Sequence, residues 1–234
     1  NVICIDKAAA PSIDFLAPDI YQRGDANYMK VIELYTRPDN CLMVPETGTQ
    51  AKYLYEVLSR GIGFSPFGVD GGRKIGVLAD EYAMLAPVAD KIAQWRLDGK
   101  LYTAFEPEDH SVQYIDLGEW KSVLTFGRAR RSNIQGAPDT GEPRPATGHA
   151  MLVKLGKDEY YAFGTNVRYS FIPQGKNEGK AWHYLRVEEG SFDENGEWVM
   201  RRVLNGDQTD WTGPYVGENP TVLRIKLYVR EPRK

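Results

Sequence analysis

Short apolar runs alternate with helix-length segments between Asn1 and Gly99. Three runs end in polar or turn residues, as strands buried on both faces do, at residues 13–21, 41–46 and 61–67. Apolar side chains at helical spacing predict helices over residues 25–35, 49–60 and 75–97. This alternation predicts β/α units and a parallel sheet, and it fits a (β/α)₈ barrel and a doubly wound sheet equally well.

The pattern changes near Asp98, and the following residues predict short strands joined by turns. The candidate strands are residues 112–116, 121–126, 149–155, 159–164, 167–172, 181–189, 198–204 and 222–229. Hairpin signals stand at residues 155–158 and 194–196, and residues 128–147, rich in Pro and Gly, predict a long loop. We therefore expect an α/β domain over residues 1–99 and an antiparallel β-sandwich over residues 100–234.

Composition narrows the classes of partner. With 42% hydrophobic and 26% charged residues the chain is typical of a globular protein. The net charge of -3 and the scattered basic residues predict no nucleic-acid partner, and no apolar run reaches the ~20 residues of a membrane span. Cys4 and Cys41 predict two buried thiols, with one disulfide between them as the alternative. The chain lacks an initiating Met and begins in an apolar pattern, which indicates part of a longer polypeptide.

Glu46 is the sharpest candidate for chemistry. It ends an apolar strand in the stretch Val-Pro-Glu-Thr-Gly, and the carboxyl ends of barrel strands face the active site. A Glu that caps the next helix is an equally good interpretation. Tyr21 ends the preceding strand, where its phenol could hydrogen-bond that carboxylate. Strand alternation predicts that Asp19 points the same way as Tyr21.

The end of the third strand carries further candidates. Phe64 and Phe67 could form an aromatic wall against which a sugar stacks, or belong to the core. Asp70 could contact substrate hydroxyls, although Asp-Gly-Gly at this point is a turn signature. In the β-rich part, aromatic residues could form a second platform for sugars, or fill the core, at Trp182, Tyr184, Trp198 and Trp211.

Other chemistries have no motif in this sequence. His110, His149 and His183 stand at no metal-ligand spacing, so we expect no metal site. A nucleophile elbow, a Walker loop and a dinucleotide-binding glycine motif are also lacking, so neither a serine nucleophile nor a nucleotide is expected.

Three stretches together resemble the last barrel strands of bacterial family 35 glycoside hydrolases, the β-galactosidase family. They are APSIDFLAPDIY (10–21), VPE (44–46) and GIGFSPFGVD (61–70). Further on, YLRVEEG (184–190) and LNGDQTDW (204–211) resemble an uncharacterised β-domain that follows the barrel in one branch of that family.

The resemblance implies that the three strands are the sixth, seventh and eighth of a (β/α)₈ barrel. It implies Glu46 as nucleophile, Tyr21 as its hydrogen-bond partner and no cofactor, with β-linked galactosides or oligosaccharides as substrates. It also implies a periplasmic or secreted location. The acid/base of that family lies on the fourth strand, which this sequence does not contain. We therefore expect the chain alone to be inactive and to need the first half of the barrel as its partner, in the same polypeptide or another chain.

Two other functions remain open from the sequence. The β-rich part could be a non-catalytic carbohydrate-binding or structural module, a possibility that depends on whether Trp182, Trp198 and Trp211 are exposed or buried. The first part could also be a doubly wound domain with Glu46 as a helix cap. A sheet in which the three strands are not successive neighbours would favour that alternative.

Overall fold

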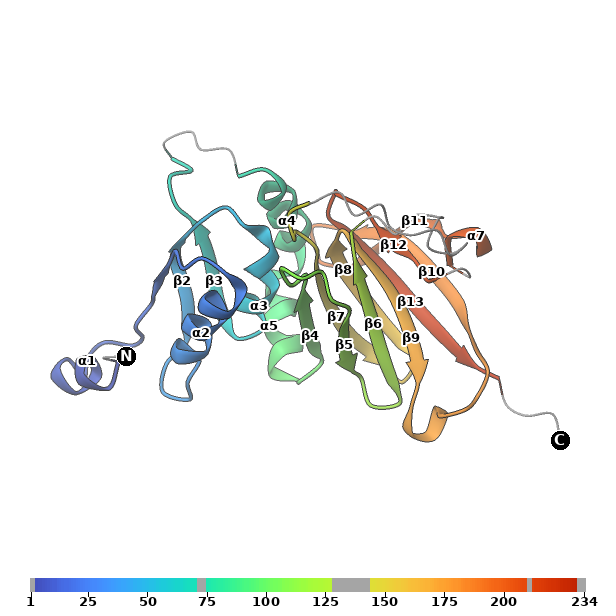
Figure 1. Ribbon diagram of the computed structural model, residues 1–234, viewed down its shortest axis with the longest axis horizontal. Helices are drawn as coiled ribbons and strands as arrows, with labels where there is room; N and C mark the ends of the chain where they lie inside the picture. The colour runs from blue at the N-terminus through green and yellow to red at the C-terminus, as the bar shows by residue number, and fades with distance from the viewer. Residues whose placement is uncertain (1–2, 71–74, 128–143, 210–211, 231–234) are drawn as a thin grey trace.

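The computed structural model describes residues 3–70, 75–127, 144–209 and 212–230 (Figure 1). Its first part contains, in chain order, α1 (Ile3–Ala9), β1 (Asp19–Ile20), α2 (Asp25–Tyr35), β2 (Leu42–Thr47), η1 (Ala51–Tyr53), α3 (Leu54–Leu58), β3 (Gly61–Pro66), α4 (Val77–Leu85), η2 (Ala86–Val88) and α5 (Ala89–Leu97). The second part contains β4 (Leu101–Phe105), β5 (Gln113–Asp116), β6 (Trp120–Phe126), β7 (His149–Gly156), β8 (Glu159–Thr165), β9 (Val167–Pro173), η3 (Gly175–Asn177), β10 (Trp182–Phe192), β11 (Trp198–Val203), α7 (Gly206–Thr209), β12 (Tyr215–Val216) and β13 (Thr221–Val229).

The first part holds a parallel sheet in the order β1-β2-β3. Successive strands are neighbours, so the sheet order does not favour the doubly wound alternative. In the described residues these strands form an open sheet with helices between them, so the β/α units are present while the closed barrel stays a prediction. Figure 1 shows α2 and α3 beside β2 and β3.

Proline shortens one predicted element and interrupts another. The strand expected over residues 13–21 is limited to Asp19–Ile20, directly after Pro18, which has no N–H for a ladder hydrogen bond. The helix expected over residues 75–97 is interrupted at Pro87, where a 3₁₀ turn joins α4 to α5. Proline is tolerated there because the chain starts a new helical segment.

The second part contains two antiparallel sheets, in the orders β11-β10-β13-β8-β7-β4 and β12-β9-β6-β5. Buried side chains of both sheets pack in one core, among them Trp120 and Tyr169 from the four-stranded sheet and Leu152 and Ile225 from the six-stranded sheet. The arrangement agrees with the predicted β-sandwich. Strands β4 and β12 were not predicted. Every residue of β4 is half-buried, so its sequence shows no alternation.

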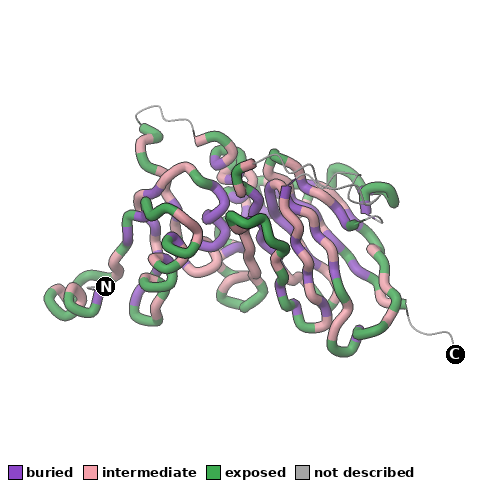
Figure 2. Tube along the Cα trace, in the orientation of Figure 1, coloured by how far each residue is buried: buried purple, intermediate pink, exposed green. Residues whose placement is uncertain are grey.

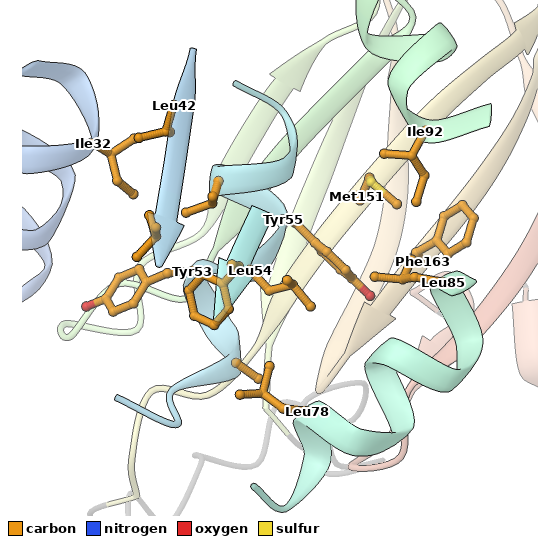
Figure 3. Close-up of a cluster of buried hydrophobic side chains, with 14 of the residues drawn as sticks. Ile32, Leu42, Tyr53, Leu54, Tyr55, Leu78, Leu85, Ile92, Met151 and Phe163 are labelled. Atoms are coloured by element: carbon orange, nitrogen blue, oxygen red, sulfur yellow. The ribbon is translucent and has the colours of Figure 1, made fainter. Parts of the chain in front are cut away.

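The opposite face of the six-stranded sheet packs against the first part of the chain. Met151 and Phe163 lie in a cluster with Tyr55, Leu85 and Ile92 from the helical segments (Figure 3). Strands β7 and β8 of this sheet are therefore buried on both faces, which explains the uninterrupted buried run from His149 to Val153 in β7. Figure 2 shows the buried segments, in purple, gathered where the strands and helices pack together. The expected boundary near residue 99 falls between α5 and β4, yet one hydrophobic core extends across it.

The prediction that the two cysteines are buried thiols is wrong. Cys4 and Cys41 are both free and exposed. In α1 the buried position is Ile3, which leaves Cys4 on the exposed side, where the Arg37 guanidinium lies 3.5 Å from its sulfur. Among the described residues, no helix is long and apolar enough to cross a membrane.

Candidate functional site

The ends of β1 and β2 bring two of the predicted site residues into contact. Tyr21 follows β1, and its phenol donates a hydrogen bond of 2.9 Å to Glu46 Oε1 near the end of β2. The parallel register sets Asp19 beside Glu46. Asp19 and Tyr21 are exposed while Ile20 between them is fully buried, as strand alternation requires.

The third strand places its candidates differently. Phe64 is only 8% exposed and belongs to the core, and its carbonyl accepts a hydrogen bond from the Tyr82 phenol. Phe67 is 56% exposed, and its backbone N–H donates to the Thr47 carbonyl, one residue from Glu46. Asp70 is exposed in the turn after β3. Of the two phenylalanines, Phe67 is therefore the one whose ring a ligand could reach.

A set of residues that the sequence did not single out lies beside this pair. Thr47 Oγ1 donates to the Ile20 carbonyl and lies 2.9 Å from the Tyr28 phenol. The Tyr28 ring stacks on Tyr53 with centroids 3.8 Å apart. Burial raises the pKa of Tyr28 to about 12, so its phenol keeps its proton at neutral pH. Helical spacing indicates only that Tyr28 faces a core. It cannot indicate which side chains Tyr28 contacts, because these lie on other elements.

A cleft of about 1160 Å³ opens next to Tyr21, between the two parts of the chain. The first part lines it with residues around Tyr21 and Thr47 and with the Tyr28–Tyr53 stack. The β-rich part contributes Glu108, Pro145, Ala146, Thr147, Thr165, Asn166 and Glu218. The volume exceeds the ~300–1,000 Å³ of pockets for drug-sized ligands. Glu46 does not itself line the cleft and reaches it through Tyr21.

Asp25, the first residue of α2, connects the two sides of the cleft. Its carboxylate accepts hydrogen bonds from the Tyr53 phenol at 2.7 Å and the Glu108 backbone N–H at 3.0 Å, and it pairs with Lys52 at 2.5 Å. Lys52 also lies over the rings of Tyr53 and Phe105. Burial, followed by the hydrogen bond to Asp25, raises the pKa of the Tyr53 phenol. Partly buried polar contacts of Asp25 therefore hold together residues on both sides of the cleft.

Glu106 organises the wall that the β-rich part contributes. Its side chain is fully buried, and its carboxylate accepts hydrogen bonds from both terminal nitrogens of Arg144 and from the backbone N–H groups of Thr147 and Gly148. His110 Nδ1 lies 2.8 Å from the same carboxylate. Burial alone would raise the pKa of Glu106, but these donors outweigh it and lower the pKa below its ordinary value.

A second buried carboxylate joins α4 to the six-stranded sheet. Glu81 Oε1 lies 2.7 Å from both His149 Nε2 and Thr165 Oγ1, while Oε2 accepts the Tyr55 phenol. His149 Nδ1 lies 2.8 Å from the Thr147 carbonyl, which can only accept, so that nitrogen carries a hydrogen. The pair of Glu81 and His149 is fully buried and structural in character.

Of the two alternatives for the aromatic residues of the β-rich part, a platform for sugars or the core, the structure favours the core for Trp182 and Trp198. Trp182 packs edge-on against Trp120, 5.5 Å away, and Trp198 packs against Phe192 and Tyr161. Both belong to the margins of the two cores because the strands that carry them are covered on those faces. Trp211 lies outside the described residues, as do residues 128–143 of the predicted long loop. The described ranges also contain no group of three His, Cys, Asp or Glu side chains that could hold a metal.

Comparison with known proteins places the β-rich part in a family. No curated protein matches the sequence. The sequence pattern of one family matches residues 78–213, from α4 to the residues before β12, and therefore includes Glu81, Glu106, His149 and Asn166. Because this match spans more than half of the sequence, the chain belongs to the family described as Domain of unknown function (DUF5597).

Proposed function

We propose that this chain is the nucleophile-bearing part of a retaining β-glycosidase, with β-galactosides as its substrate class. The observation that carries the proposal is the hydrogen bond from Tyr21 to Glu46 at adjacent ends of two parallel strands. The resemblance of residues 10–21, 44–46 and 61–70 to family 35 glycoside hydrolases supports the same roles for these two residues.

In this proposal the ionised Glu46 carboxylate attacks the anomeric carbon. A covalent glycosyl–enzyme forms as the glycosidic bond breaks, and water later releases the sugar with net retention. A phenol that donates to one carboxylate oxygen limits rotation of the group. Tyr21 thus acts as a positioning residue that aims Glu46.

The reaction also needs a second carboxyl group, about 5–5.5 Å from the first, that protonates the leaving oxygen and later activates water. By the family resemblance this group lies on a strand that precedes β1 in the barrel. We propose that it comes from polypeptide outside these 234 residues. The isolated chain is then inert, and the assembled protein is active.

The first test compares variants of the full-length protein that carries this chain. An aryl β-galactoside with an activated leaving group is the substrate, because it needs little acid assistance and reports on the nucleophile. Glu46→Gln should lower kcat at least ~10³-fold. Tyr21→Phe should lower kcat by about tenfold, the loss of one hydrogen bond to a charged group. Glu33→Gln, on the exposed side of α2, is the matched control and should keep full activity.

The outcomes separate the candidate functions. A Glu46→Gly variant removes the carboxylate and leaves room for an external nucleophile. If this variant is inactive and regains activity with added azide, as an α-glycosyl azide product, the result is that expected of a retaining nucleophile. Activity that survives the Glu46→Gln change would refute the proposal. A full-length protein that binds sugars and hydrolyses none would instead favour the non-catalytic carbohydrate-binding module.

A further inference from the structure

We propose that the β-rich part is itself a substrate-binding wall: Thr147, Asn166 and Glu218, with Glu108, bind the sugar units of a neutral β-linked oligosaccharide beyond the unit at Glu46. This inference rests on the proposed function, because it assigns the substrate that extends from that site. It gives the DUF5597 part a direct role in specificity.

The cleft connects the proposed reaction centre to the β-rich part. The cleft begins at Tyr21, the residue in contact with Glu46, and extends to Asn166 and Glu218 on the β-rich part. A single sugar ring at Glu46 would leave most of a 1160 Å³ space unfilled. A saccharide chain that leaves the reaction centre through this cleft must therefore contact the β-rich wall.

Asn166 has an unusual backbone conformation. It connects β8 to β9 with a φ of 51°, a region that non-glycine residues seldom adopt, although Asn tolerates it. Both of its backbone groups are used, since its N–H donates to the Gly217 carbonyl and its carbonyl accepts from Gly127, each at 2.7 Å. These two hydrogen bonds hold the turn in this conformation, in which Asn166 lines the cleft.

The side-chain amide of Asn166 is held on both sides. Its nitrogen donates to Thr147 Oγ1 at 3.1 Å, and its oxygen lies 3.4 Å from the Tyr215 phenol. A primary amide has two N–H donors and two lone pairs, so each of these contacts uses only part of its capacity. The amide can therefore both donate to and accept from vicinal hydroxyls of a sugar.

The wall is also rigid before any ligand binds. Glu106 accepts the backbone N–H groups of Thr147 and Gly148 at 3.0 and 2.9 Å, which orders the segment that carries Thr147. Asp25 accepts the Glu108 N–H and so fixes the distance between the two walls. Such preorganisation reduces the entropy lost on binding.

The chemistry of the lining selects a neutral polyhydroxylated ligand. Among the described residues that line the cleft, Arg23 and Lys52 are balanced by Glu108 and Glu218, so these residues carry no excess of one charge. Hydroxyl, amide and carboxylate groups line the cleft, while the stacked Tyr28 and Tyr53 rings are themselves buried. Hydrogen-bonding groups of both donor and acceptor type suit a sugar, which has hydroxyls at its edge.

The test measures binding of β-1,4-linked galactotriose to this 234-residue chain by titration calorimetry. Asn166→Gly is the main variant, because glycine keeps the positive φ and removes only the side chain. We expect the dissociation constant to rise about five- to tenfold, as for the loss of one to two hydrogen bonds. Asn195→Gly, in the exposed turn before β11, is the matched control and should bind like the parent chain.

A second variant guards against a folding defect. Glu218→Gln alters an exposed lining residue and should weaken binding at least twofold without a change in melting temperature. The inference is overturned if the parent chain shows no saturable binding, or if both cleft variants bind as tightly as it does. The two proposals can fail separately. If hydrolysis survives Glu46→Gln while binding still depends on Asn166, Glu46 is not the nucleophile but the binding wall remains supported.

Discussion

Single carboxylates organise the polar interior of this protein, and they differ in how visible they are in the sequence. Glu46 ends an apolar strand, so the strand pattern alone marks it and its neighbour Tyr21 as candidates. Glu106 follows β4 in an ordinary Glu-Pro-Glu-Asp stretch, and its donors from Arg144 and Gly148 come from 38 and 42 residues away. No local pattern marks such a residue, because its importance depends on chain segments that meet only after folding.

Glu106 leads to a prediction about pH. Its pKa is lowered in the folded protein from an ordinary value of 4.5, so its contribution to stability is present above that pH and is lost as the pH falls below it. Glu106→Gln should lower the free energy of unfolding by about 2–4 kcal/mol near pH 7, since it leaves buried donors without a charged acceptor. The difference from the parent chain should shrink below about pH 4.

Urea denaturation at several pH values checks this prediction. Glu178→Gln, at an exposed position after η3, serves as the control and should change stability by less than ~0.5 kcal/mol at every pH. A difference for Glu106→Gln that stays constant from neutral to acid pH would contradict the role assigned to its charge.

Some helices and strands can be predicted from the periodicity of the sequence, and others cannot. The helix at Asp25–Tyr35 and the runs that become β2 and β3 agree with their periodicity, because each has one face or both faces in a core. Strand β12 is only two residues long and exists because it pairs with β9 at the edge of a sheet. A two-residue strand has no periodicity to detect, so only the partner strand defines it.

The contact between β2 and β3 gives a prediction at this scale. A Cβ added to Gly61 would overlap the Leu42 carbonyl on the neighbouring strand and lie 2.9 Å from the Leu42 Cβ. A Cβ added to Gly63 would lie 3.5 Å from Met43 Cγ, which is an ordinary contact distance. Gly61→Ala should therefore destabilise the protein by about 1–3 kcal/mol. Gly63→Ala is the matched control and should be neutral or stabilising by up to about 1 kcal/mol.

Thermal unfolding followed by circular dichroism measures both glycine variants. The interpretation predicts a lower melting temperature for Gly61→Ala only. Equal effects of the two substitutions would mean that the close approach of β2 and β3 is not what requires glycine at residue 61.

At the scale of the whole molecule, the six-stranded sheet is the structural centre. It shares one core with the four-stranded sheet and another with the helices of the first part. Glu81 crosses the second core from α4 to reach His149 on β7 and Thr165 on β8. This buried polar contact joins the first part to the sheet within the same core.

The Glu81 contact gives the last prediction. Glu81→Gln puts an amide where the buried His149 and the Tyr55 and Thr165 hydroxyls face a carboxyl group, so it should destabilise the protein by about 3–5 kcal/mol. Asp80→Asn changes the same charge one residue earlier at an exposed position and should stay within ~0.5 kcal/mol of the parent chain. Chemical denaturation compares the two, and similar stabilities would show that the pair does not join the parts.

The sequence by itself determined the alternation of strands and helices before Gly99, the antiparallel pattern after it, and the candidate pair Tyr21 and Glu46 at two strand ends. These features follow from local periodicity and from the fact that parallel strands end at one edge of a sheet. Only the tertiary structure decided that β7 and β8 are buried on both faces, that Trp182 and Trp198 pack into cores, and that Asn166 faces the same cleft as Tyr21. Each of these depends on contacts between residues far apart in the chain, which no short window of sequence contains.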